Sequence, residues 1–242
     1  MHNRPHKGQP WILRCRGHII GGNMEKSLRY LLHDEETKLW WAKKLKIEDR
    51  IGEVSWSTYE SIRVHTPRRR QLWTMKFGAD LLPTRQNLVK RNHSSIKNCP
   101  WCNNECETTD HIFQCTSEEM NKCFNDELDK LQDFLAETTS TEIKNNLLDL
   151  IRCIRSNQVP NETVGSEVEE TKKKQFALGQ RATLNGAWHQ EWIDHQNLFF
   201  KRQGSRKDGK VWAVQVAIII QTMCHNLWKT RNEAIHQVET SE

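Results

Sequence analysis

The chain has 242 residues, a length that suits one large domain or two small ones. Hydrophobic residues make up only 36% of it and charged residues 28%, so a core is possible but lean, and the net charge of +5 is mild. The N-terminus contains no apolar run of secretory length, and Gln215 interrupts the longest apolar stretch, VWAVQVAIII. We therefore expect an intracellular protein, in the nucleus or the cytoplasm with the nucleus favoured.

The first half of the chain predicts helices separated by turns. Residues 1–22 are polar, contain Gly and Pro, and are expected to be loosely structured. Apolar residues at helical spacing predict helices over 23–46 and 57–78, and Pro67 should start or kink the second half of the latter. A turn follows, and a short helix is expected to begin at Thr84.

The helical pattern is stronger in the middle of the chain. Apolar residues recur every three or four positions over 120–135 and again over 143–154. The sequences TSEE at 116–119 and TSTE at 139–142 have the form of capping boxes that start helices. We expect the two helices to pack as an antiparallel pair across a short loop.

The last third of the chain begins with a polar stretch. Residues 155–174 contain few large apolar side chains and are interpreted as a linker or flexible loop. Two Trp-bearing helices are expected after it, over about 176–202 and 209–237. No alternating pattern is long enough to predict a sheet, so the fold class is mostly α.

A cysteine-rich segment, CPWCNNECETTDHIFQC, lies between the predicted helices. It is too poor in apolar residues to fold around a core, and clustered cysteines in an intracellular chain favour a metal over disulfides. Cys99 and Cys102 form a C-x2-C pair, and His111 and Cys115 lie one helical turn apart, which completes a tetrahedral set for one Zn²⁺. Four protein ligands leave no open position, so the ion is predicted to be structural.

Other residues of this segment are assigned supporting roles. Cys106 could replace a ligand, but its place in the bridging loop favours a spare thiol. Thr109 and Asp110 can cap the ligand helix or hydrogen-bond to the ligands. A loop of free thiols is the alternative to the metal site.

Positive charge is concentrated just before the cysteines. Between Arg63 and Lys97, nine Lys and Arg residues face one acid, Asp80, which leaves a local charge of +8. Phosphate is the natural counter-charge, so we predict contact with RNA or DNA. The predicted contacts are Arg68, Arg69, Arg70, Lys76, Arg85, Lys90, Arg91 and Lys97, with Trp101 as a base-stacking residue. The alternatives are a solvated helix face, pairing with the acidic helix at 118–129 and, for Trp101, packing against the helix at 84–91.

These elements define the predicted organisation: an irregular helical array with a small treble-like CCHC zinc-binding module inserted between helices. Its units are an N-terminal helical or loose segment (1–50), a basic helix with the zinc-binding module (51–125), a continuing helical hairpin (126–157), a linker (158–175) and a C-terminal helical pair (176–242).

No catalytic or organic cofactor site is predicted. The acidic residues lie on exposed helix faces, not as paired carboxylates on rigid strands. The G-x4-G-K match at 204–210 is followed by Val211, where a phosphate-binding loop needs Ser or Thr, and is interpreted as a turn between helices. We therefore expect a protein that is not an enzyme and has neither a small-molecule substrate nor a membrane partner.

The basic and cysteine-rich segments together resemble the zinc-binding region of reverse transcriptases encoded by non-LTR retrotransposons. That pattern has a basic Trp-bearing helix, a Lys…Gly…Leu-Pro-Thr…Leu segment, a C-x2-C pair, an acidic bridge, and a His followed by Cys. It maps here to Trp73, Lys76, Gly78, Leu82, Pro83, Thr84 and Leu88, then Cys99, Cys102, Glu107, His111 and Cys115. The later LWKTRNEAIH at 227–236 is similar to a Trp-x-x-Arg-Asn ending downstream in such reading frames. One feature departs from the pattern: three residues separate His111 from Cys115, whereas four residues are frequent at this place in the family.

The resemblance implies a function but not an activity. The chain has no Tyr-x-Asp-Asp polymerase motif and no acidic set for a ribonuclease H domain. It therefore resembles the C-terminal, non-polymerase part of such an element, which helps to hold template RNA or target DNA near the polymerase. Two alternatives stay open. One is a protein-interaction module whose Trp-rich helices dock a polymerase domain or another partner, and the other is a decayed retroelement fragment.

Overall fold

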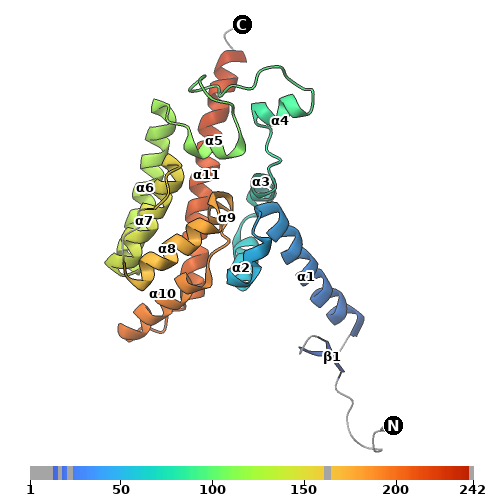
Figure 1. Ribbon diagram of the computed structural model, residues 1–242, viewed down its shortest axis with the longest axis vertical. Coiled ribbons are helices and arrows are strands. Elements are labelled where there is room, and N and C mark those ends of the chain that lie inside the picture. The colour runs from blue at the N-terminus through green and yellow to red at the C-terminus, as the bar shows by residue number, and fades with distance from the viewer. Residues whose placement is uncertain (1–12, 16–17, 21–23, 161–164, 240–242) are drawn as a thin grey trace, which may run out of the picture.

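The structure is a computed structural model that describes residues 13–15, 18–20, 24–160 and 165–239, with side chains for 35–160 and 165–235. It is mostly helical, as predicted (Figure 1). A small antiparallel hairpin of β1 (Leu13–Cys15) and β2 (His18–Ile20) was not predicted, because three-residue strands show too little alternation. The rest of the segment predicted to be loose, residues 1–22, lies outside the described residues.

The N-terminal half follows the predicted helices closely. Thr66 is extended, as residues before proline usually are, and Pro67 stands at the N-cap of the next helix, so the predicted 57–78 helix is divided in two. Thr84 caps the short basic helix by accepting a hydrogen bond from the Asn87 N–H. The elements are α1 (Met24–Leu45), the 3-10 helix η1 (Glu48–Glu53), α2 (Trp56–His65), α3 (Arg68–Gly78) and α4 (Arg85–Lys90).

The predicted helical pair in the middle of the chain is present. It consists of α6 (Glu118–Thr138) and α7 (Thr141–Ser156), which contact each other and follow the short helix α5 (Thr109–Gln114). Their N-caps are Ser117 and Ser140, each one residue later than the predicted capping boxes. In both boxes two neighbouring hydroxyl residues can cap, and the serine is the one whose oxygen accepts the backbone N–H.

The C-terminal third differs from the prediction in two places. The predicted linker over 158–175 contains most of a helix, α8 (Glu167–Ala177), whose buried side includes the polar Thr171 and Gln175 and therefore gives no apolar pattern. The predicted helix over 176–202 is divided because Gly179 and Gly186 adopt positive φ angles of 95° and 87°. The elements here are α9 (Gln180–Leu184), α10 (Gln190–Arg202) and α11 (Gly209–Glu239).

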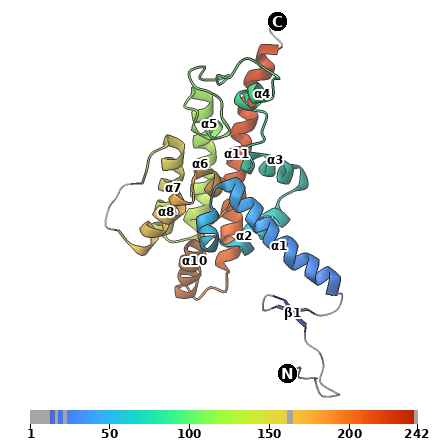
Figure 2. The same ribbon diagram turned by 45° about the vertical axis from the view of Figure 1, so that its right-hand side comes forward.

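Helix α11 runs through the helical body, and the hairpin and the start of α1 extend beyond it (Figures 1 and 2). Helix α11 contacts α2, α5, α6, α9 and α10, so elements from the first half and from the second half of the chain pack on it. Residues 209–235 are long and apolar enough to cross a membrane by length and composition alone, yet most of this stretch is covered by neighbouring helices. It is the central core helix of this fold.

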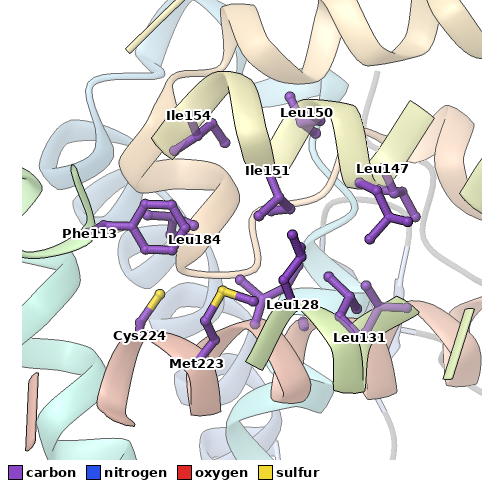
Figure 3. Packing of buried hydrophobic residues seen from close by; sticks show 14 of the residues in the cluster. Phe113, Leu128, Leu131, Leu147, Leu150, Ile151, Ile154, Leu184, Met223 and Cys224 are labelled. Carbon is purple, nitrogen blue, oxygen red and sulfur yellow. The ribbon is translucent and has the colours of Figure 1, made fainter. Parts of the chain in front are cut away.

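The main apolar core lies between α5, α6, α7, α9 and α11 (Figure 3). Leu131, Leu150 and Ile151 are fully buried there, and Phe113 from α5 points into the same cluster. A smaller cluster joins the end of α1 to α9 through Trp41 and neighbouring apolar residues. Because Phe113 lies on the helix that also carries a predicted metal ligand, the core reaches directly under the cysteine-rich segment.

Candidate metal centre and the basic surface beside it

The structure brings the four predicted ligands together. The donor atoms of Cys99, Cys102, His111 and Cys115 all lie within 4.8 Å of one another. The Cys99 and Cys115 sulfurs are 3.7 Å apart, and the Cys102 sulfur lies 3.4 Å from His111 Nε2. A tetrahedral Zn²⁺ with ordinary bond lengths requires separations of about 3.8 Å between sulfurs and about 3.6 Å between sulfur and nitrogen. The four side chains could therefore hold one metal ion with little adjustment.

Backbone hydrogen bonds shape the C-x2-C turn. The Cys99 N–H donates to the Glu105 carbonyl at 2.8 Å, and the Asn103 N–H donates back to the Cys99 carbonyl at 3.0 Å. Asn103 takes the left-handed conformation, with φ 54°, that Asn tolerates better than most residues. The strand-like pairing of Asn98 with Cys106 closes the loop, so both cysteines of the turn face the same side. Cys106 is half-buried and lies outside the ligand group, consistent with a spare thiol.

Helix α5 supplies the other two ligands. His111 lies within the helix and Cys115 at its C-cap, one turn later. The predicted cap was Thr109 or Asp110, but the structure uses Thr108, whose hydroxyl accepts the His111 N–H at 2.9 Å. Thr109 instead donates to Asp80 at 2.6 Å.

Glu105 orients the histidine ligand. Its carboxylate lies 3.1 Å from His111 Nδ1, which leaves Nε2 pointing at the sulfurs. A carboxylate on the far nitrogen fixes the tautomer and ring orientation of a metal-binding histidine. Glu105 was not singled out from sequence, although an acid in the bridging loop of a histidine ligand is a signal that could have found it.

The crowded donor atoms perturb one another. Hydrogen bonding from Cys99 is the main cause that lowers the pKa of Cys115 to about 3, and the same hydrogen bond together with burial raises the pKa of Cys99. Burial lowers the pKa of His111, but hydrogen bonds and charges from Cys115 and Cys102 outweigh it and raise the pKa to about 9. The site thus gathers negative charge that a cation would offset.

Arg155 of α7 secures the C-terminal side of the ligand helix. Its buried guanidinium donates to the carbonyls of Phe113 and Cys115, and to Asn121 Oδ1 at 2.9 Å. Burial lowers the pKa of this arginine to about 10. Since three thiolates and one Zn²⁺ carry a net charge of about −1, a cation at this position also balances a loaded centre.

Glu107 links the bridging loop to two helices. Its side chain has 0% exposure and forms a bidentate ion pair with Arg231 of α11, which is 4% exposed. The same carboxylate accepts the Arg85 N–H at the start of α4, at 2.6 Å. Glu107 belongs to the acidic bridge, and Arg231 belongs to the Trp-x-x-Arg-Asn segment, so two motifs far apart in sequence meet in one buried contact.

A third arginine secures the start of the ligand helix. Arg181 of α9 donates to both oxygens of Asp110, at 3.1 and 2.8 Å, and lies 3.8 Å from Asp80. Arginines from α7, α9 and α11 therefore tie the cysteine-rich segment to the helical body at three points. None of the three was predicted, because their partners are remote in sequence.

The predicted nucleic-acid residues fall into two groups. The side chains of Arg70 and Arg85 are half-buried and engaged within the fold, Arg70 with Thr222 Oγ1 at 2.7 Å and Arg85 with the Asn98 carbonyl at 2.8 Å. The others are exposed, namely Arg68, Arg69, Lys76, Lys90, Arg91 and Lys97. Within the described part of the chain none of these eight forms an ion pair, so the alternative of pairing with the acidic helix α6 gains no support.

Trp101 has a structural position. It is half-buried against the main core, and its indole N–H donates to the Thr230 carbonyl of α11 at 3.0 Å. The contact thus joins Trp101 to α11, whereas the alternative drawn from the sequence was packing against the helix at 84–91. A ring held in this way is part of the packing, so we do not include Trp101 in the binding surface proposed below.

Comparisons of this chain with protein-family models, with curated proteins and with solved structures find no match. The chemistry of the site and the distribution of charge are therefore the basis for a functional proposal.

Proposed function

We propose that the protein binds RNA or DNA without catalysing a reaction, as the zinc-binding C-terminal part of a retrotransposon reverse transcriptase. The observation that carries this proposal is the charge of the 63–97 segment. Six exposed cations on α3, α4 and the following loop lack an ion-pair partner among the described residues. The single acid of the segment, Asp80, is already engaged by Thr109. Phosphate groups would supply the missing counter-charge.

The start of α3 is the strongest part of this surface. Arg68, Arg69 and Arg70 occupy its first turn, which contains no acid, and Pro67 at the N-cap offers no capping side chain. The N-terminus of a helix carries a partial positive charge, so three further cations there repel one another and the helix dipole. A bound phosphate relieves this repulsion.

The metal has a positioning role in this proposal. Three cysteines and one histidine at tetrahedral separation are a ligand set that Zn²⁺ favours, and a closed set points to a structural ion. The metal fixes the loop that carries Glu107, and Glu107 binds the first N–H of α4. In this proposal the metal thereby fixes the orientation of α4, with Lys90 and Arg91, relative to the helical body.

The alternative of a docking module loses its main support. It relied on Trp-rich C-terminal helices, but the indoles of Trp188, Trp192, Trp212 and Trp228 are all buried in the core. Side chains that pack inside the protein do not offer a surface to a partner.

The test is a salt series with a fluorescent oligonucleotide, measured by anisotropy. The double variant Arg68→Ala and Arg69→Ala removes two exposed cations of α3. We expect weaker binding and a slope of log K against log salt that is shallower by about 1.4 for a single strand or about 1.8 for a duplex. The matched control removes two exposed cations at the end of α10, Lys201→Ala and Arg202→Ala, and should leave the slope unchanged. An oligonucleotide that fails to bind at low salt, or equal slopes for both variants, would contradict the proposal.

A further inference from the structure

Helix α11 adjoins the basic start of α3. The rings of Trp73 on α3 and His225 on α11 are in edge-to-face contact, with their centroids 5.0 Å apart. Thr222, one turn before His225, accepts the hydrogen bond from Arg70. Arg69 and Arg70 precede Trp73 by one helical turn and so lie on the same side of α3. The two helices therefore meet along a line that runs through His225.

Among the residues that the structure describes, the charges that act noticeably on His225 are all positive. Arg69 and Arg70 approach it from α3, and the exposed Lys229 lies one turn further along α11. Burial of the ring lowers the pKa of His225, and these three charges lower it further. The ring is only half-buried, while its Nδ1 atom is buried and has no hydrogen-bond partner in the described part of the chain. His225 is thus kept neutral at a place where cations converge.

We propose that Arg69, Arg70, His225 and Lys229 form one phosphate-contacting surface, and that His225 takes up a proton from solvent when nucleic acid binds there. This inference rests on the proposed function and extends its binding surface from α3 to α11. A phosphate places negative charge among the three cations and offsets their repulsion of the imidazolium. The imidazole gains one proton on binding, and no other bond is made or broken.

The sign of the pH dependence follows directly. In the free protein the pKa of His225 lies below its ordinary value. A phosphate bound beside the ring would favour its charged form, so the pKa of His225 would be higher in the complex. The complex therefore binds more protons than its separate components, so affinity increases as the pH falls through the interval between the two pKa values. One proton allows at most a tenfold change in affinity per pH unit, which sets the scale of the effect.

The experiment compares the affinity for a labelled single-stranded RNA of mixed sequence across about pH 6 to about pH 8 at constant ionic strength. His225→Asn removes the titrating group. The matched control is His195→Asn, because His195 is also a half-buried histidine on a helix but faces Thr171 of α8. In His225→Asn the dependence of Kd on pH should be weaker. For the wild type and the control, we expect the factor by which Kd increases over each pH unit to be about three times larger than the factor for His225→Asn. Equal slopes in the wild type and His225→Asn would overturn the inference.

A direct titration keeps the test independent of the folding of any variant. The ring signals of His225, followed by NMR in the wild-type protein with and without the RNA, should report a higher pKa in the complex. An unchanged pKa would overturn the inference while leaving the proposed function intact. If the wild-type protein fails to bind the RNA even at low salt, both the proposed function and this inference fail.

Discussion

The cysteine-rich module, residues 97–117, and the helical body beneath it acquire a fixed shape by different physical means. The body buries aliphatic side chains from α6, α7 and α11, with Leu131 and Leu150 completely inside (Figure 3). The module buries most of the candidate metal-binding atoms and the Glu107 carboxylate, which pairs with Arg231 of the body. The arginines that bind the module belong to the body. The module therefore depends on the body for its anchors, and it contributes Ile112 and Phe113 to the edge of the main core. Because most of that core lies outside the module, we expect the body to depend less on the module than the module does on the body.

Removing a metal ligand should have the largest effect and should separate the two regions. Cys115→Ser takes away one thiolate, and structural zinc contributes about 10–16 kcal/mol in zinc-finger peptides. We expect loss of the metal by elemental mass analysis and faster amide exchange over the module, while α6 and α7 keep their protection.

The control for this variant is Cys106→Ser, which changes a thiol outside the ligand group and should keep the metal. A Cys115→Ser protein with a full complement of metal would disprove the assigned ligand set. A helical body that unfolds together with the module would remove the asymmetry between the two regions.

Breaking the buried ion pair should come next in magnitude. Arg231→Met leaves the Glu107 carboxylate buried and unpaired, which costs about 3–5 kcal/mol. Urea unfolding measures this loss, and the variant should also release its metal to a chelator more readily because the loop is less well held.

The matched double variant, Glu107→Leu with Arg231→Met, removes both charges and should recover much of the lost stability, since apolar replacements of buried pairs are often neutral. If Arg231→Met alone is as stable as the wild type, the module is not anchored through α11.

A cavity in the body should destabilise the protein without affecting the metal site. Leu131→Ala is expected to cost about 2–5 kcal/mol, because the side chain is fully buried between helices. Leu39→Ala is the control, since Leu39 is 59% exposed and its truncation should change stability by less than about 0.5 kcal/mol. Metal content and the rate at which a chelator removes the metal should be unchanged in both variants. A lower metal content in Leu131→Ala would show that metal binding by the module depends on the packing of the core.

The contrast between the regions also decides what the sequence could predict. The body was predictable because its apolar residues recur at helical spacing over 120–135 and 143–154, a local signal. The ligands were predictable because their spacing is itself local. Helix α8 was missed because its buried side is polar, and the break before α10 was missed although the dipeptide Asn185-Gly186 is a recognised turn signal.

The arginine contacts that anchor the module to the body could not be predicted from the sequence around each arginine. Arg155, Arg181 and Arg231 bind partners that are 42, 71 and 124 residues away in the sequence. Nothing near an arginine indicates that its guanidinium will meet a backbone carbonyl or a carboxylate so far along the chain. Such contacts depend on how the helices pack, which the spacing of apolar residues does not specify.

The smallest effect should come from the partly exposed pair at the start of the ligand helix. Asp110→Asn weakens the contact with Arg181, whose side chain is 19% exposed while that of Asp110 is 40% exposed. Exposed ion pairs contribute about 0.2–1 kcal/mol because water screens them, and Arg181 still has Asp80 within 3.8 Å. A double-mutant cycle with Arg181→Met, measured by urea unfolding, isolates the pair. A coupling energy near that of the buried Glu107 pair would mean that this contact is shielded as well, and that the module has two strong anchors and not one.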